Sequence, residues 1–283
     1  MNNTWAIIGL GFISQRHIDS IKNIGDKLLM ACDVDESKKE KVPDVRFFND
    51  YNVMLADPEF SKVDCVAICT PNYLHYQMIK KCVDAGKRVL CEKPLVIDSK
   101  QLESLSENVG TVLQLRYNPE IIEAKKEIEE QLKKLEDINE GVVAGELTMK
   151  LNRGDFYWRG WKGDEAQSGG LLFNIGIHYF DLIVYLLGTP TNSYADILTK
   201  SYAKGLLIYP KVVIFWELSL EAPMDNQIRR LKLFGKNFDL TRNFDGLHQR
   251  VYEDFVAGKL VAPSQAKDVI KLVEELKVLG IKK

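Results

Sequence analysis

The sequence predicts an α/β Rossmann domain with a doubly wound parallel sheet, followed by an α+β domain with an open, mostly antiparallel sheet. Two observations predict the first domain: strand-like and helix-like segments alternate through residues 1–118, and a glycine turn joins the first strand to the first helix. One observation predicts the second: residues 142–234 contain successive strand-like segments joined by short turns. We therefore expect two domains, 1–118 and 119–283.

Composition bounds the function before any motif is considered. The 283 residues are 46% hydrophobic and 28% charged, with a formal net charge of −2. A nucleic-acid-binding surface would need a basic excess, so we expect no nucleic-acid partner. No apolar run approaches the roughly 20 residues of a membrane span, and the N-terminus lacks signal-peptide features, so we expect no membrane and a cytoplasmic location. The five cysteines show no CxxC spacing, so we expect core thiols in a reducing compartment and no metal site.

A glycine pair between the first predicted strand, residues 4–8, and the first predicted helix points to a dinucleotide site. Gly9 permits the tight turn, and Gly11 lets the backbone approach a pyrophosphate. The start of the helix offers unpaired N–H groups to that anion, so Phe12 and Ile13 join the expected cofactor site. Ser14 stands where the common pattern has a third glycine. The alternative is a plain turn.

The end of the second predicted strand selects the cofactor. Residues 28–32 are apolar and end on Asp33, about twenty residues after the glycines. A carboxylate there accepts hydrogen bonds from both ribose hydroxyls and repels a 2′-phosphate, which favours NAD over NADP. The alternative is that Asp33 belongs to a turn, because residues 35–37 also look like the start of a helix.

Two charged residues follow a third apolar strand. Residues 89–91 read as a buried strand that ends on Glu92 and Lys93, and Pro94 then stops the ladder. A carboxylate and an amine are thus placed at the end of a strand, where open α/β sheets bind their ligands. The alternative is a strand that runs out into solvated charge.

The second half carries one polar constellation on an apolar helix. Helical spacing places Asn174, His178 and Asp181 on one face. An amide, an imidazole and a carboxylate in a row suit proton handling, with Asp181 orienting or charging the ring. The alternative is a satisfied core histidine, because the helix stays apolar as far as Leu187.

Taken together, residues 9–14, 33, 92–94 and 169–181 resemble the glucose-fructose oxidoreductase/inositol dehydrogenase (Gfo/Idh/MocA) family, over nearly the whole chain. Residues 69–76, 113–116 and 152–164 are similar to the bacterial UDP-N-acetylglucosaminuronate 3-dehydrogenases. The resemblance implies oxidation of the sugar C3 hydroxyl with NAD, in the synthesis of diaminouronates for surface polysaccharides such as O-antigen.

The resemblance also implies the remaining site residues. The catalytic residues would be Lys93 and His178. The cofactor site would add Thr70, Asn72, His75, Glu92, Lys93, Gln114 and Trp161. The substrate site would consist of Lys93, Arg116, Arg153, Tyr157, Lys162, Asn174 and His178. Asn174 stands where the wider family usually has Asp, which removes one candidate acid, although the UDP-sugar branch resembles this chain in carrying Asn.

In the mechanism that we expect, hydride leaves a carbinol carbon for NAD while a base removes the hydroxyl proton, with the substrate between the two domains. His178 is the preferred base because its pKa needs no shift. Lys93 can serve as a base only if its pKa falls, so it is assigned electrostatic assistance.

Two other functions stay open. One is an NAD-dependent dehydrogenase of an inositol or a free sugar, and the other is a non-catalytic NAD-binding regulator, which would need neither Lys93 nor His178. We also expect a homodimer or homotetramer. Residues 206–209 and 212–216 are apolar on both strand faces, and the family that this chain resembles pairs such sheets face to face.

Overall fold

The chain forms two compact units in the computed structural model, which describes residues 2–136, 141–241 and 245–280. The first unit combines Met1–Gln114 with Asp245–Ala266, and the second combines Leu115–Phe244 with Lys267–Lys283. These units differ from the continuous domains 1–118 and 119–283 that the sequence suggested, because a late segment returns to the first unit.

The first unit contains a six-stranded, all-parallel sheet in the order β3-β2-β1-β4-β5-β6. The strand order runs outward in both directions from the β1–β4 pair, which is the switch point where doubly wound sheets bind ligands. The predicted Rossmann architecture is confirmed. The strands are β1 (Thr4–Ile8), β2 (Lys27–Cys32), β3 (Arg46–Phe48), β4 (Cys65–Ile68), β5 (Arg88–Cys91) and β6 (Val109–Thr111).

Short helices and 3-10 turns connect these strands. The α-helices are α1 (Ser14–Asn23), α2 (Tyr51–Ala56), α3 (His75–Asp84) and α8 (Leu247–Val256). The 3-10 turns are Glu36–Lys41, Pro58–Lys62, Asn72–Leu74, Ser99–Ser104 and Gln114–Tyr117, the last at the start of the second unit.

Two predicted elements were wrong. The sequence pattern predicts a helix over residues 98–107, where the structure has the 3-10 turn Ser99–Ser104. It also predicts a strand over residues 112–115, but the last strand of the sheet, β6, ends at Thr111. Val112 and Leu113 are almost fully buried without belonging to a strand. These residues are apolar because they are buried. A short apolar run in a buried loop has the same sequence pattern as a buried strand, so periodicity cannot separate the two.

Aromatic packing assigns α8 to the first unit. The Trp5 ring of β1 lies 4.9 Å from the Tyr252 ring and 5.5 Å from the Phe255 ring, and Trp5 is fully buried. The Arg88 guanidinium lies 4.6 Å from the Phe255 ring centroid. The amphipathic pattern of residues 247–257 predicts a helix, but it carries no signal of which sheet the helix covers.

The second unit contains a six-stranded sheet in the order β12-β11-β7-β10-β9-β8. Only the β10–β7 pair is parallel, so the predicted open, mostly antiparallel sheet is confirmed. The strands are β7 (Val143–Lys150), β8 (Asn192–Leu198), β9 (Tyr202–Ile208), β10 (Val212–Ser219), β11 (Ile228–Leu233) and β12 (Lys236–Asp239). The helices are α4 (Pro119–Glu136), α5 (Gly154–Arg159), α6 (Glu165–Ser168), α7 (Ile177–Leu187) and α9 (Pro263–Leu279), with a π-helix at Leu172–Gly176 and a 3-10 turn at Trp161–Gly163.

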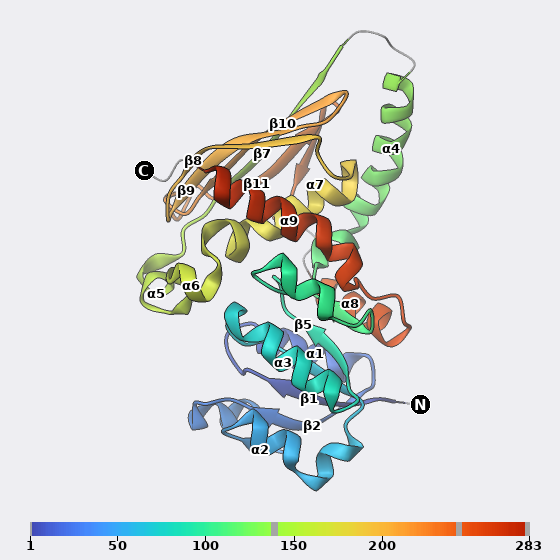
Figure 1. Ribbon diagram of the computed structural model, residues 1–283, viewed down its shortest axis with the longest axis vertical. Helices are drawn as coiled ribbons and strands as arrows, with labels where there is room; N and C mark the ends of the chain where they lie inside the picture. The colour runs from blue at the N-terminus through green and yellow to red at the C-terminus, as the bar shows by residue number, and fades with distance from the viewer. Residues whose placement is uncertain (1, 137–140, 242–244, 281–283) are drawn as a thin grey trace. The chain divides into compact units, whose positions relative to one another are not determined.

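Helices α7 and α9 lie against one face of this sheet (Figure 1). The Phe180 ring of α7 meets the Trp216 ring of β10 edge-on, at 5.3 Å between centroids. Among the described residues, one helical stretch, Glu165–Leu187, is long and apolar enough to cross a membrane. Since 72% of its most apolar window is buried, the stretch has the character of a core helix.

The opposite face of the sheet carries a row of apolar side chains. Tyr194, Leu206 and Phe215 are register partners on the neighbouring strands β8, β9 and β10. Phe215 is 52% exposed and Tyr194 is 46% exposed. Strands β9 and β10 therefore carry apolar side chains on both faces, as expected. On the face away from the helices, these side chains are partly exposed to solvent in the single chain.

Candidate functional site

The glycine turn after β1 has two glycines with different requirements. Gly9 has a φ of 93°, and a Cβ there would lie 2.7 Å from the carbonyl carbon and oxygen of Cys69. The fold itself therefore excludes a side chain at Gly9. A Cβ at Gly11 would meet no protein atom within 4 Å, so nothing in the protein demands glycine there. The Ser14 hydroxyl closes the turn by donating to the carbonyl oxygen of Gly11 at 2.7 Å.

Asp33 is tied to this turn. Its Oδ2 accepts from the backbone N–H of Leu10 at 2.6 Å, and its Oδ1 accepts from that of Asp35 at 2.9 Å. The turn interpretation of Asp33 therefore has a structural basis. A carboxylate has about four lone-pair positions, so these two bonds leave capacity for ribose hydroxyls, and ribose binding stays a prediction.

One residue at the turn escaped the sequence analysis. The Lys41 ammonium donates to the carbonyl oxygens of Leu10 and Gly11 at 2.9 and 2.8 Å. No motif marks Lys41, because it lies in the 3-10 turn after β2, about thirty residues from the glycines. Phe12, expected in the cofactor site, is 88% exposed beside it.

His75 joins the loops that follow β4 and β5. Its Nδ1 lies 2.7 Å from the carbonyl oxygen of Pro94, and its Nε2 lies 3.0 Å from that of Thr70. The ring is fully buried, and a place for His75 in the cofactor site stays a prediction. His75 fixes the two loops. Asn72, at 3% exposure, is similarly enclosed.

Glu92 is a buried carboxylate at the end of β5, 7% exposed. Its Oε1 lies 2.9 Å from Nε2 of His17 in α1 and 3.6 Å from Nε2 of His248 in α8. Its Oε2 accepts from the backbone N–H of Lys93 at 3.2 Å. The Nδ1 of His17 in turn pairs with the Tyr252 hydroxyl at 2.8 Å. The carboxylate thus links α1 and α8 to the backbone of the proposed catalytic lysine.

The charges of this cluster follow from its contacts. Burial lowers the pKa of His17, so its ring is neutral near pH 7, donates from Nε2 to Glu92 and accepts at Nδ1 from Tyr252. Burial alone would raise the pKa of Glu92, but the imidazoles of His17 and His248 bring that pKa well below its ordinary value. Glu92 is therefore ionised, and hydrogen bonds from His17 and from the backbone of Lys93 stabilise its negative charge.

The same three side chains could in principle hold a metal ion. One ligand atom from each of His17, Glu92 and His248 lies within 4.8 Å of the others. A His–Glu–His set is a known zinc donor set. The cysteine count, on which the expectation of no metal site rested, says nothing about such a group. The hydrogen bond between His17 and Glu92 explains the closeness of these two residues by itself.

The side-chain oxygen of Gln114 accepts no hydrogen bond from the described residues. Gln114 is 8% exposed, and its Oε1 is buried with no hydrogen-bond partner among the described residues. A buried orphan acceptor is destabilising unless a ligand or water supplies the N–H. Together with the open space at Gly11, this fits a bound dinucleotide that carries a carboxamide.

The second unit brings two predicted substrate residues together. Asn174 donates from Nδ2 to the Tyr157 hydroxyl at 2.7 Å, and both side chains are buried. Asn174 lies in the π-helix Leu172–Gly176, directly before α7 and the half-buried His178. Such π-turns within α-helices are frequently found at functional sites, and no periodicity in the sequence predicted this one.

Asp181 has a different partner from the one expected. Both of its oxygens accept from the Arg116 guanidinium, at 2.6 to 3.2 Å, and Asp181 is 1% exposed. The carboxylate that was expected to orient or charge His178 therefore neutralises Arg116. Arg116 is correspondingly less available as a cation for substrate, and that role stays a prediction.

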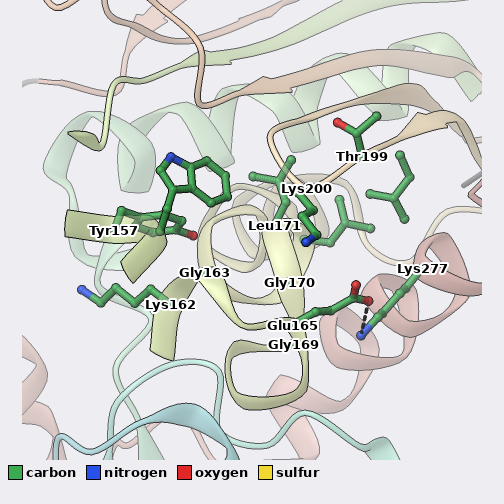
Figure 2. Close-up of a pocket in the computed structure, with 13 residues that line it drawn as sticks. Tyr157, Lys162, Gly163, Glu165, Gly169, Gly170, Leu171, Thr199, Lys200 and Lys277 are labelled. Atoms are coloured by element: carbon green, nitrogen blue, oxygen red, sulfur yellow. Dashed lines mark ion pairs between the residues drawn. The ribbon is translucent and has the colours of Figure 1, made fainter. Parts of the chain in front are cut away.

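A cavity of about 160 Å³ lies beside the segment that contains α5 and α6 (Figure 2). Tyr157 and Lys162 line it, but Arg153, Asn174 and His178 do not. Lys277 and Glu165 form an ion pair of 3.1 Å at its wall, drawn dashed in Figure 2. The Lys162 ammonium lies 5.6 Å from the ring of the half-buried Trp161. The cavity therefore gathers part of the predicted set, together with Lys200, which sequence reasoning missed.

Replacing the two glycines should separate folding from cofactor binding. Gly9→Ala should lower the free energy of unfolding by roughly 2 kcal/mol or more, because of its φ and the contact with Cys69. Gly11→Ala should change that free energy by less than about 0.5 kcal/mol but weaken NAD binding. Denaturant unfolding and calorimetric NAD titration measure the two effects. Unchanged NAD affinity in Gly11→Ala would make Gly11 an ordinary turn residue.

Acid should weaken the first unit through Glu92 and His17. His17 has a folded pKa below its ordinary 6.5, and Glu92 one well below 4.5. The stability from His17 is complete above pH 6.5 and is lost as the pH falls below it, and that from Glu92 is lost only below 4.5. Glu92→Gln should cost about 2 kcal/mol at pH 7, and the difference from wild type should narrow below pH 4.5.

The exposed Glu103 provides the control for this experiment. Glu103→Gln should leave the stability within about 0.5 kcal/mol of wild type at every pH. Thermal and denaturant unfolding from about pH 8 down to about pH 2 compare the three proteins. A Glu92→Gln variant as stable as wild type at pH 7 would contradict the account of the cluster.

The comparisons with known proteins agree with both sheets. Among solved structures, the chain is similar to the WlbA (WbpB) dehydrogenase of Thermus thermophilus in complex with NAD and alpha-ketoglutarate, at 29% identity and a TM-score of 0.89, over 99% of this chain and 96% of that one. A structure of that dehydrogenase in complex with NAD and UDP-GlcNAcA gives 28% identity and a TM-score of 0.87, over 99% and 95%.

Two sequence relatives act on other compounds. The D-glucoside 3-dehydrogenase of Escherichia coli (strain K12) is 29% identical over 65% of this chain and 54% of that protein. The myo-inositol 2-dehydrogenase of Thermotoga maritima is 27% identical over 65% and 54%. The chain spans about half the length of the curated relatives that it matches.

Family membership follows from the two halves of the chain separately. Residues 4–112 match an oxidoreductase family by its NAD-binding Rossmann fold, and residues 142–229 match the GFO/IDH/MocA C-terminal domain. The resemblance carried by residues 9–14, 92–94 and 169–181 is thereby confirmed. This chain belongs to the GFO/IDH/MocA family of oxidoreductases, and its first unit contains an NAD-binding Rossmann fold.

Proposed function

We propose that this protein oxidises the C3 hydroxyl of UDP-N-acetylglucosaminuronate to the 3-keto sugar with NAD, for the synthesis of a surface polysaccharide. The observation that carries the proposal is the likeness, along 99% of the chain, to a dehydrogenase crystallised with NAD and UDP-GlcNAcA. The presence of both Lys93 and His178 supports turnover over a regulatory role.

The first unit supplies the groups that would hold NAD. The turn at Gly11 leaves room for the pyrophosphate, Asp33 has lone pairs for the ribose, and the orphan Oε1 of Gln114 suits an amide N–H. When bound, NAD supplies the hydride acceptor. Glu92 holds the backbone of Lys93 beside this site through its Oε2.

The second unit supplies the base. His178 takes the hydroxyl proton, since an imidazole titrates near neutral pH, while the Lys93 ammonium stabilises the developing alkoxide. Asn174 donates an amide N–H to the Tyr157 hydroxyl, which fixes its side chain within the proposed site. An amide at this position cannot act as an acid, which leaves proton transfer to His178 and Lys93.

A second enzyme function has a specific observation in its favour. The matched relatives include enzymes of inositols and glucosides, which carry no nucleotide. The segment of Trp158, Trp161 and Lys162 favours the nucleotide sugar, because aromatic rings stack on a base and cations bind phosphate. The two functions share the hydride chemistry and differ in the substrate.

Nicotinamide absorbance with a panel of substrates tests the proposal. UDP-N-acetylglucosaminuronate should reduce NAD, and UDP-N-acetylglucosamine, which lacks the carboxylate, should do so far less well. Lys93→Met and His178→Ala should each lower turnover by a factor on the order of 10² or more, with NAD affinity nearly unchanged. Higher activity on myo-inositol or glucose would favour the second enzyme, and activity on none of these would favour the regulator.

The open face of the second sheet should be an interface between copies of this chain. The row of Tyr194, Leu206 and Phe215 exposes apolar area that dimerisation would bury. Light scattering at micromolar concentration should find a dimer or tetramer, and Phe215→Lys should shift it towards the monomer. Phe156→Lys, at a 74% exposed aromatic residue of α5, is the control. A monomeric wild type would refute this expectation.

A further inference from the structure

Arg153 carries a charge that the second unit does not neutralise. Its side chain is half-buried, and its Nε is buried with no hydrogen-bond partner among the described residues. No ion pair with an acid is found for it in that part of the chain. A partly buried guanidinium with an unsatisfied N–H is destabilising, and an anionic ligand would remove that cost.

A second arginine lies beside it. Arg229 is the second residue of β11, opposite the fully buried Met149 of β7. Strand alternation puts Arg229 on the same face as Leu231, which is also fully buried, so it belongs to the helix-covered face of the sheet. The side-chain oxygen of Gln227, two residues earlier, accepts from the backbone N–H of Asn152, which brings the two arginine segments together.

No carboxylate is among the groups found to act on the Arg153 charge in the described part of the chain. Burial lowers the pKa of Arg153, and the like charge of Arg229 lowers it further. The other groups that act on this charge are the hydroxyls of Tyr157 and Tyr179. Arg116 provides the contrast, because Asp181 neutralises it through a bidentate pair. Arg153 and Arg229 thus act on each other as like charges, and neither forms an ion pair with an acid among the described residues.

The pair adjoins the proposed reacting groups. Tyr157 accepts the hydrogen bond of Asn174, and the Tyr179 ring lies edge-on to the His178 ring at 6.5 Å between centroids. An anion held by these arginines would therefore belong to the molecule that Asn174 and His178 contact. Paired guanidinium donors match a carboxylate or a phosphate through parallel N–H bonds.

We propose that Arg153 and Arg229 form one anion subsite, which binds a carboxylate or phosphate group of the substrate. Arg229 is new to the site, since neither the motifs nor the family resemblance pointed to it. The identity of the ligand rests on the proposed function, but the existence of the subsite does not.

Steady-state kinetics with two substrates identify the anion. Arg229→Gln should raise the KM for UDP-N-acetylglucosaminuronate by roughly 10- to 100-fold, the scale of a charge-assisted pair, and leave the KM for NAD unchanged. If the arginines bind the carboxylate, the KM for UDP-N-acetylglucosamine stays as in wild type. If they bind the diphosphate, it rises by the same factor. Unchanged KM values for both sugars would overturn the proposal.

The control is the next residue of the same strand. Arg230 lies on the opposite face of β11, so Arg230→Gln removes the same charge without touching the subsite. It should leave all KM values unchanged. Arg229→Lys keeps the charge but not the planar fork, and should fall between wild type and Arg229→Gln. Equal KM effects of Arg229→Gln and Arg230→Gln would mean that net charge alone is responsible.

Thermal unfolding separates the subsite from a structural role. Because Arg229 and Arg153 repel each other without an internal anion, Arg229→Gln should keep or raise the melting temperature. A marked fall would show that Arg229 pairs within the protein and would overturn the subsite.

Thermal shift with simple anions tests the subsite even if no UDP-sugar is a substrate. Free glucuronate or inorganic phosphate should raise the melting temperature of wild type and Arg230→Gln, whereas glucose should not. Arg229→Gln should lose this response. Stabilisation of Arg229→Gln equal to that of wild type would refute the subsite, whatever the enzyme oxidises.

Discussion

A buried carboxylate, Glu92, is the constraint on which the first unit depends. An ionised group without water is tolerated only where the fold supplies hydrogen bonds. Here they come from His17 of α1, which starts at the glycine turn, and from the backbone of Lys93, with His248 of α8 nearby. One charge therefore sets the relative positions of the expected cofactor turn, the end of β5 and a helix from the C-terminal part of the chain.

The second unit treats its charges in two ways. Asp181 and Arg116 satisfy each other, and Asn174 is held by Tyr157, so these polar side chains are fixed by the protein alone. Arg153 and Arg229 are not satisfied in this way. Stable proteins avoid buried charges without partners unless a function requires them. What marks the arginine pair as a place for a ligand is the unpartnered Nε of Arg153 together with the like charge of Arg229.

Much of the fold followed from the sequence, because alternation, glycine placement and apolar runs are local signals. Gly9, Asp33 and the strand before Glu92 were found this way, and the five cysteines are buried as expected. Long-range contacts left no such signal. Three features depend on residues far apart in the chain. Helix α8 packs in the first unit, Asp181 pairs with Arg116 and not with His178, and Lys41 donates to the glycine turn. Arg229 was missed because a lone arginine on a strand looks like solvated charge.

The proposed function requires this fold to bind NAD together with the UDP derivative of a sugar acid. Mass spectrometry of the small molecules released from the purified protein, after incubation with both cofactors and a mixture of UDP-sugars, inositols and free sugars, tests it most directly. We expect NAD or NADH, together with UDP-N-acetylglucosaminuronate or its 3-keto product, because the bound pair can react. Recovery of NADP in place of NAD, or of an inositol or free sugar in place of the UDP-sugar, would contradict it.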